Sequence, residues 1–220
     1  MPGPLAVFDI DGTLVRGDCG VLFSLFCARH GLLSASELAA TAAWGARALL
    51  GRIGEPEVAE AKRLMLRFRI RLGEERFDAI YDRCFREWIV PRLRRDTLRE
   101  LAARKSEGAV VLITANLRDL SLRLGRELDL PADRCFGATA ERKNGVLTGE
   151  LEGPVPMAEE RGRLIRALLV QAGIDRTSAS AYGDSIHDAP MLREVDRPCA
   201  VHPSRALRAL ARQENWRIID

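Results

Sequence analysis

Short apolar segments next to polar side chains constrain the fold of this 220-residue chain more than any other feature. Runs of this length and composition are typical of buried β-strands. The four segments are residues 5–10 (LAVFDI), which contain Asp9; 109–113 (AVVLI), followed by Thr114; 179–182, which lead into Asp184; and 199–201.

Helical patterns separate these segments. They cover residues 98–104, 117–128, 158–172, 189–195 and 204–213. Strands that alternate with helices predict an α/β fold, with a Rossmann-like parallel sheet covered by helices on both faces. Ligands of such sheets bind at the carboxyl ends of the strands, so we expect Asp9, Thr114 and Asp184 to share one site.

Residues 19 to about 90 break the alternation. Apolar side chains recur at helical spacing over residues 58–72 and again over residues 77–88. The segment 66–72 (LRFRIRL) alternates with the period of a strand, but its helical flanks favour a helix. We therefore expect a helical domain of residues 18–90, closed by Pro91 and inserted into a core domain of residues 1–17 and 91–220.

A small β-hairpin is expected at residues 140–152. Its signal is Asn144-Gly145, a dipeptide typical of tight turns, which lies between residues that favour strands.

Composition narrows the class of protein. Hydrophobic residues make up 47% of the chain and charged residues 30%, as in globular domains, and the net charge of +3 is too small to indicate nucleic-acid binding. The cysteines number five and none have CxxC spacing, which disfavours a disulfide framework or a thiolate zinc site and favours the cytoplasm. Since the N-terminal MPGPLAVFDID lacks a basic region and no 18-residue apolar stretch is free of charge, we expect neither a signal peptide nor integral membrane association.

Two acidic clusters follow predicted strands. Asp9 and Asp11 lie in FDIDGTL, where a turn at Gly12 would bring both carboxylates to one point, and Asp184 and Asp188 lie in YGDSIHD. Each cluster alone is also compatible with a polar turn or a capped helix start. Together they resemble a carboxylate cage for Mg²⁺, which prefers oxygen ligands.

The segment Thr114-Ala115-Asn116 is a candidate phosphate site. We expect it to lie at the start of a helix, where a hydroxyl beside free N–H groups suits a phosphate oxygen. The alternative is that Thr114 only caps the helix expected at residues 117–128.

The order of DxDGT, a strand-end Thr, a basic residue and GDSxxD resembles the haloacid-dehalogenase-like superfamily of phosphohydrolases. The helical insertion is similar to that superfamily's C1 cap. The NGVLTGELEG hairpin and the C-terminal segment from YGDSIHDAPML onward resemble subfamily IB, the branch that includes phosphoserine phosphatase.

The resemblance implies a role for each motif residue. Asp9 would be the nucleophile that becomes an aspartyl phosphate, and Asp11 the general acid and base. Thr114 would bind the phosphoryl group. Asp184 would ligate Mg²⁺ together with Asp9 and the backbone carbonyl of Asp11, and Asp188 would support the ion as a ligand or from outside the ligand shell.

The third motif departs from the family pattern. The family expects a Lys beside the nucleophile, but the matching segment MAEERGR contains none. Arg161 is the best match and Arg163 the second choice, while Lys143 lies beside the predicted hairpin turn. Arginine keeps the positive charge but is longer and planar. A solvent-facing helix position is the alternative for Arg161.

The insertion is expected to select the substrate. Asp18 lies where phosphoserine phosphatases tend to carry a Glu that binds the substrate ammonium, although it also suits a helix N-cap. The arginines of the insertion suit an anionic substrate, a lipid headgroup or, more simply, a solvated helix face. They are Arg63, Arg67, Arg69 and Arg71. We expect no histidine among the metal ligands.

The sequence thus predicts a cytoplasmic, Mg²⁺-dependent phosphatase that acts through an aspartyl phosphate on a small phosphorylated metabolite. An amino-alcohol phosphate is the default substrate, and histidinol phosphate is one example. The alternatives are a phosphotransferase or phosphomutase of the same fold, a lipid-phosphate phosphatase, and a binding protein with an impaired catalytic site. The oligomeric state stays open.

Overall fold

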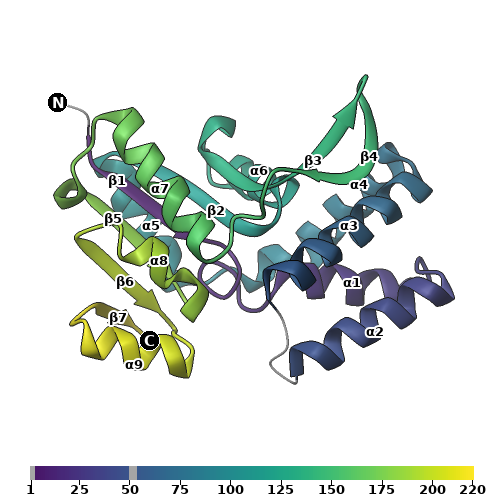
Figure 1. The fold of residues 1–220 in the computed structure, drawn as a ribbon, viewed down its shortest axis with the longest axis horizontal. Coiled ribbons are helices and arrows are strands. Elements are labelled where there is room, and N and C mark those ends of the chain that lie inside the picture. Colours follow the sequence, from purple (N-terminus) through teal and green to yellow (C-terminus); the bar gives the residue numbers. More distant parts are fainter. Residues whose placement is uncertain (1–2, 50–53) are drawn as a thin grey trace.

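A computed structural model describes residues 3–49 and 54–220, and its centre is a seven-stranded sheet (Figure 1). The order of the strands is β4-β3-β2-β1-β5-β6-β7, and all neighbours are parallel except β3 and β4. The strands are β1 (Leu5–Asp9), β2 (Ala109–Leu117), β3 (Cys135–Lys143), β4 (Val146–Glu152), β5 (Ala179–Gly183), β6 (Arg197–Val201) and β7 (Arg217–Ile219). The predicted α/β fold is confirmed, and β7 is a short edge strand that the sequence did not reveal.

Helices cover both faces of the sheet, because each carries one apolar stripe. Leu101, Leu120 and Leu124, on α5 and α6, belong to the apolar cluster of one face. Ile165 and Leu207, on α7 and α9, belong to that of the other face. The helices of the core are α5 (Arg95–Glu107), α6 (Arg118–Glu127), α7 (Glu159–Ala172), α8 (Ala189–Leu192) and α9 (Arg205–Gln213).

Strand β2 corrects one expectation. It continues through Thr114 to Leu117, where it pairs with Ala138 after a register shift. Helix α6 begins only at Arg118, and its N-terminus has no side-chain cap. Thr114-Ala115-Asn116 therefore lie in a strand and not at a helix start, and the N-cap alternative for Thr114 is wrong, because pairing with β3 holds these residues extended.

Helices fill the insertion, as predicted. They are α1 (Cys19–Arg29), α2 (Ala35–Leu49), α3 (Glu55–Leu72) and α4 (Glu74–Cys84), followed by a π-helical turn (Phe85–Ile89) and a 3₁₀ turn (Val90–Arg92). The LRFRIRL segment is helical and ends α3. The rings of Phe23, Phe68, Phe77 and Tyr81 pack together among α1, α3 and α4. Residues 50–53 of the expected insertion lie outside the described residues.

The two chain segments that join the insertion to the core run side by side. Arg16 N–H donates to Arg92 O (2.9 Å), and Arg94 N–H donates to Leu14 O (2.8 Å). Arg94 Nε also donates to Gly12 O at 3.0 Å. The insertion therefore leaves and re-enters the core at one place, next to the loop after β1.

The predicted hairpin is confirmed as β3 and β4, which pair antiparallel around a two-residue turn. Asn144 and Gly145 have φ angles of 51° and 81°, the left-handed conformations that such a turn requires. Gly149 of β4 lies against the Arg67 and Ile70 side chains of α3. The hairpin thus reaches from the sheet to the insertion (Figure 1).

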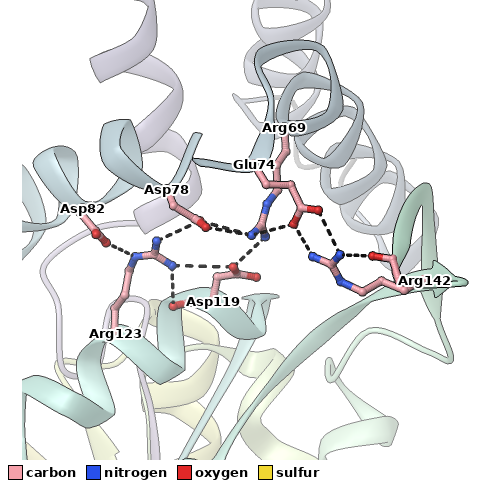
Figure 2. Close-up of polar contacts among 8 residues, drawn as sticks. Arg69, Glu74, Asp78, Asp82, Asp119, Arg123 and Arg142 are labelled. Atoms are coloured by element: carbon pink, nitrogen blue, oxygen red, sulfur yellow. Dashed lines mark hydrogen bonds and ion pairs between the residues drawn. The ribbon is translucent and has the colours of Figure 1, made fainter. Parts of the chain in front are cut away.

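A set of ion pairs, here called the cap–core ion network, joins α3 and α4 to α6 and β3 (Figure 2). Its members are Arg69, Glu74, Asp78, Asp82, Asp119, Arg123 and Arg142. Arg69 of α3 lies 2.8 Å from Asp119 Oδ1 and 3.2 Å from Asp78 Oδ2. Arg123 of α6 lies 2.6 Å from Asp82 Oδ1.

Arg69 corrects the interpretation of the four arginines as one cluster. Only 8% of its side chain is exposed, because it is enclosed between α3, α4 and α6 and lies over the Phe77 ring. Arg67 and Arg71 are about half exposed and pair with glutamates, as surface arginines commonly do. Within the described residues, no helix has both the length and the apolar character needed to span a membrane.

Candidate active site

The carboxyl ends of β1 and β5, together with the distal part of β2, bring the predicted motif residues together. Asp9 is the last residue of β1, Thr114 lies in β2, and Asp184 directly follows β5. The three strands are neighbours in the sheet, so residues more than 100 positions apart meet at one edge. The structure thus brings the three predicted residues to one edge of the sheet.

Asp9 is almost completely enclosed, with 1% of its surface exposed. Burial raises its pKa to about 6; Arg161 opposes this shift, and the negative charge of Asp11 adds to it. Asp9 Oδ1 is buried and receives no hydrogen bond from the described residues, although Arg161 Nη2 lies 2.8 Å away. The carboxylate is thus positioned by β1 with its Oδ1 beside the Arg161 guanidinium.

Asp184 and Asp188 form the second acidic group. Burial and, to a lesser extent, the negative charge of Asp9 raise the pKa of Asp184 to about 7. Asp188 Oδ2 accepts hydrogen bonds from the N–H groups of Asp184 and Ser185, at 3.0 and 2.9 Å, and from Ser185 Oγ. Asp188 therefore holds the loop after β5 in place.

These acids fit a hard divalent cation. One oxygen each from Asp9, Asp184 and Asp188 lie within 4.8 Å of one another. Mutual repulsion and burial disfavour this arrangement unless a cation compensates it. Gly12 permits the close approach, since a Cβ atom there would lie 2.1 Å from Asp184 Oδ2, and its φ of 84° suits glycine.

Arg161 lies in the site, as expected, and Arg163 does not. Its guanidinium contacts Asp9 and Asp188 on one side, while Nε donates to Pro156 O at 2.9 Å. The side chain of Arg163 is 72% exposed and pairs with Glu160 on the same helix. The solvent-facing alternative for Arg161 is therefore wrong, because its position on α7 faces the sheet.

Asp11 is held by three donors. Thr114 Oγ1 and Asn116 Nδ2 donate to its Oδ2 at 2.7 and 3.0 Å, and Cys19 N–H donates to Oδ1 at 2.7 Å. Asn116 N–H also donates to Thr114 Oγ1 at 2.9 Å. Ala115 packs against an apolar cluster between α3 and the sheet. The expected phosphate segment thus orients Asp11 in this structure.

Lys62 is a site residue that the sequence interpretation missed. It extends from α3 of the insertion, is 7% exposed, and donates through Nζ to Asn116 Oδ1 at 2.5 Å. The signal that identifies it is its spacing, since Val58, Lys62 and Leu66 lie four residues apart on the helix face that packs on the core.

Asp18 both caps a helix and borders the site. Its Oδ1 accepts from Val21 N–H at 2.8 Å, which confirms the N-cap alternative for α1. A Cβ atom on Gly20 would lie 3.1 Å from Asp18 Oδ1 and 3.4 Å from Lys62 Nζ. The Asp18 carboxylate and the Lys62 ammonium therefore lie around Gly20, where α1 and α3 approach the loop after β1.

Comparison with known proteins identifies the family. The profile of the family described as haloacid dehalogenase-like hydrolase matches residues 6–193. The chain belongs to this hydrolase family. A phosphoserine phosphatase of Mycobacterium tuberculosis is 33% identical to the hydrolase over 98% of the chain and 70% of that protein. A histidinol-phosphatase of Neisseria meningitidis is 22% identical over 98% of each chain.

A solved structure shows the same fold for the whole hydrolase. It is a protein of unknown function from Bordetella pertussis, with a TM-score of 0.86 and 24% identity, and the match covers 100% of this chain and 99% of that one. These findings confirm the predicted family, its α/β fold and the prediction of a phosphatase.

Three of the arginines considered for substrate binding pair with glutamates outside the candidate active site. Arg63 and Arg67 pair with Glu60 and Glu150 on the surface of α3 and β4, and Arg71 pairs with Glu37. His30 packs on Phe26, His187 is exposed, and His202 bonds to Asp96. Among the described residues, the candidate metal group contains carboxylates alone.

Proposed function

We propose that the hydrolase is a Mg²⁺-dependent phosphomonoesterase in which Asp9 forms an aspartyl phosphate. The observation that carries the proposal is the convergence of Asp9, Asp184 and Arg161 at one sheet edge, beside an Asp11 that is oriented separately. A nucleophile, a counter-charge and a proton donor are the groups that such a reaction needs.

The cation would be held by the carboxylates of Asp9 and Asp184 and by the backbone carbonyl of Asp11. Asp188 would support it from outside the ligand shell, because donors occupy both of its oxygens. A bound Mg²⁺ would offset the negative charge of the phosphoryl oxygens. Arg161 would supply the positive charge that a lysine provides elsewhere in the family.

The chain's own residues account for both half-reactions. A carboxylate oxygen of Asp9 attacks phosphorus, and the ester P–O bond breaks with its electron pair on the leaving oxygen, which takes a proton from Asp11. Asp11 then removes a proton from water, whose oxygen attacks phosphorus. The bond between Asp9 and phosphorus breaks, which releases inorganic phosphate and restores the carboxylate.

The substrate proposed is a small phosphate ester with an amino group. The relatives named as phosphoserine and histidinol phosphatases act on esters of this kind. Asp18, at the start of the proposed cap domain of residues 18–90, would be the carboxylate that binds the ammonium group. The five cysteines are free and buried, which supports the expected cytoplasmic location.

The test is phosphate release from a panel of phosphomonoesters, with Mg²⁺ and with EDTA. The blank is Asp9→Asn, which keeps the shape of the side chain but removes the nucleophile. Release that requires Mg²⁺ and is absent from the blank supports the proposal, and the fastest ester indicates the substrate class. Release by the blank at the wild-type rate contradicts the role of Asp9. No release from any ester favours a phosphotransferase or an impaired site.

A further inference from the structure

Lys62 is a buried cation that lies between apolar side chains on the core-facing side of α3. Val58 and Leu66, one turn before and one turn after it, belong to an apolar cluster with Leu117 and Ala138 of the sheet. This packing sets the position of α3 on the core, and it aims the Lys62 side chain at the β2 residues next to Asp11. Burial of an ammonium group is costly unless it is hydrogen-bonded, so the hydrogen bond to Asn116 offsets part of the cost of burying Lys62.

The contact fixes the orientation of the Asn116 amide. A lysine ammonium can only donate, so it requires the Asn116 oxygen and leaves the amide NH₂ to face Asp11. Asn116 Nδ2 and Thr114 Oγ1 together occupy Asp11 Oδ2, whereas Oδ1 accepts one bond, from Cys19 N–H. Oδ1 is thus the oxygen with room for a transferable proton.

We propose that Lys62 is a positioning residue, which acts through Asn116 to orient Asp11 for proton transfer when α3 is docked on the core. The inference rests on the proposed phosphatase function. Without the ammonium group, the Asn116 oxygen loses the partner that fixes it, and the amide can rotate so that its NH₂ group no longer donates to Asp11 in one set geometry. The cap thereby contributes to proton transfer as well as to substrate selection.

Leaving groups of different basicity separate this role from a structural one. An alkyl ester such as ethanolamine phosphate needs a proton on its leaving oxygen, whereas 4-nitrophenyl phosphate releases a stable anion. For Lys62→Met we expect kcat to fall about 30-fold with ethanolamine phosphate and only about threefold with 4-nitrophenyl phosphate. The larger fall is below the roughly 100-fold or more that general acid catalysis contributes, because Asp11 itself is retained. KM should change little with either ester.

Two further variants complete the experiment. Lys62→Arg should restore most of the alkyl-ester rate, because arginine also only donates. Lys143→Met removes a lysine that is 73% exposed, so both rates should stay at the wild-type value. Asn116→Ala should reproduce the selective loss, and the double variant with Lys62→Met should lose no more than Asn116→Ala alone.

The outcomes distinguish this inference from the proposed function. Equal falls with both esters overturn the positioning role, and so does a rise in KM at unchanged kcat, which indicates that Lys62 binds substrate directly. Additive losses in the double variant overturn the path through Asn116. If wild-type protein hydrolyses neither ester faster than Asp9→Asn, the proposed function itself fails and the positioning role fails with it.

Discussion

Acids in the two groups of charges in this molecule have pKa values that shift in opposite directions. At the sheet edge, Asp9, Asp184 and Asp188 lie together, Arg161 contacts Asp9 and Asp188, and the pKa values of Asp9 and Asp184 are raised to about 6 and about 7. In the cap–core ion network, three arginines face four acids, and the hydrogen bond from Arg142 lowers the pKa of Glu74.

The contrast follows from charge balance and exposure. The acids of the network are between 24% and 43% exposed and each has an arginine partner, so arginines offset most of their negative charge and water screens the rest. The acids of the site exceed their counter-charges and are shielded from water, which leaves them to be completed by a cation. The candidate active site thus differs from the cap–core ion network in the larger excess of negative charge that the protein itself does not neutralise.

Removal of the nucleophile should have the largest effect. Asp9→Asn is expected to lower kcat at least about 1,000-fold, because no carboxylate remains to attack phosphorus. Binding of Mg²⁺ should weaken but stay measurable, since Asp184 is unchanged. Steady-state kinetics and calorimetric titration with Mg²⁺ measure the two quantities, with the exposed Asp133→Asn as control. Retention of most activity would contradict the assignment.

Removal of the Arg161 guanidinium should have the second-largest effect. Arg161→Ala is expected to lower kcat/KM about 100-fold, because it leaves Asp9 and Asp188 without their counter-charge. Arg163→Ala removes an exposed side chain of the same type from the same helix and should change kcat/KM less than twofold. The reverse order of the two effects would move the third motif to Arg163.

Binding of Mg²⁺ should strengthen as pH rises, because the pKa values of Asp9 and Asp184 are raised. Folding raises the pKa of Asp9 and Asp184 above the ordinary 3.8, so ionisation opposes folding of the metal-free protein as pH rises from about 4 to 7. Mg²⁺ should therefore raise Tm more at pH 7.5 than at pH 5.5, and its affinity should increase up to about tenfold per pH unit for each proton displaced. Thermal unfolding with Mg²⁺ and with EDTA tests this, and an equal shift at both pH values would refute it.

Within the network, Arg123 should matter most for stability. It is 7% exposed, contacts three aspartates and lies 4.6 Å from the centre of the Tyr81 ring. Arg123→Ala should lower the free energy of unfolding by about 2 kcal/mol, less than for a fully buried pair because its partners are partly hydrated. Urea denaturation measures it. Loss of Mg²⁺ affinity in Arg123→Ala would contradict the separation of the network from the candidate active site.

Removal of Arg142, at the exposed end of the network, should have the smallest effect on stability. Arg142 and Glu74 are each 41% exposed, and solvent weakens such pairs. Arg142→Ala should lower the free energy of unfolding by at most about 1 kcal/mol at low salt, and the difference should shrink in 1 M NaCl. Denaturation at the two salt concentrations is the measurement. An effect above that of Arg123→Ala, or one independent of salt, would contradict this ranking.

Local signals carried most of what could be predicted. Apolar strands, helical periodicity and the Asn144-Gly145 turn depend on neighbours in sequence, so β1, α3 and the hairpin agree with expectation. The length of β2 was missed, because its last residues are strand only through pairing with β3. Edge strand β7, with three residues, is too short to give a periodic signal.

The sequence by itself determined that acids follow the strands of a parallel sheet, which is sufficient to bring Asp9 and Asp184 together, since parallel neighbours end at one edge. Only the tertiary structure decided that Arg161 enters the site, that Lys62 reaches Asn116, and that Arg69 is buried between cap and core. These are long side chains on helices. Their surroundings depend on how each helix rotates and docks, and that is set by packing between residues distant in the chain.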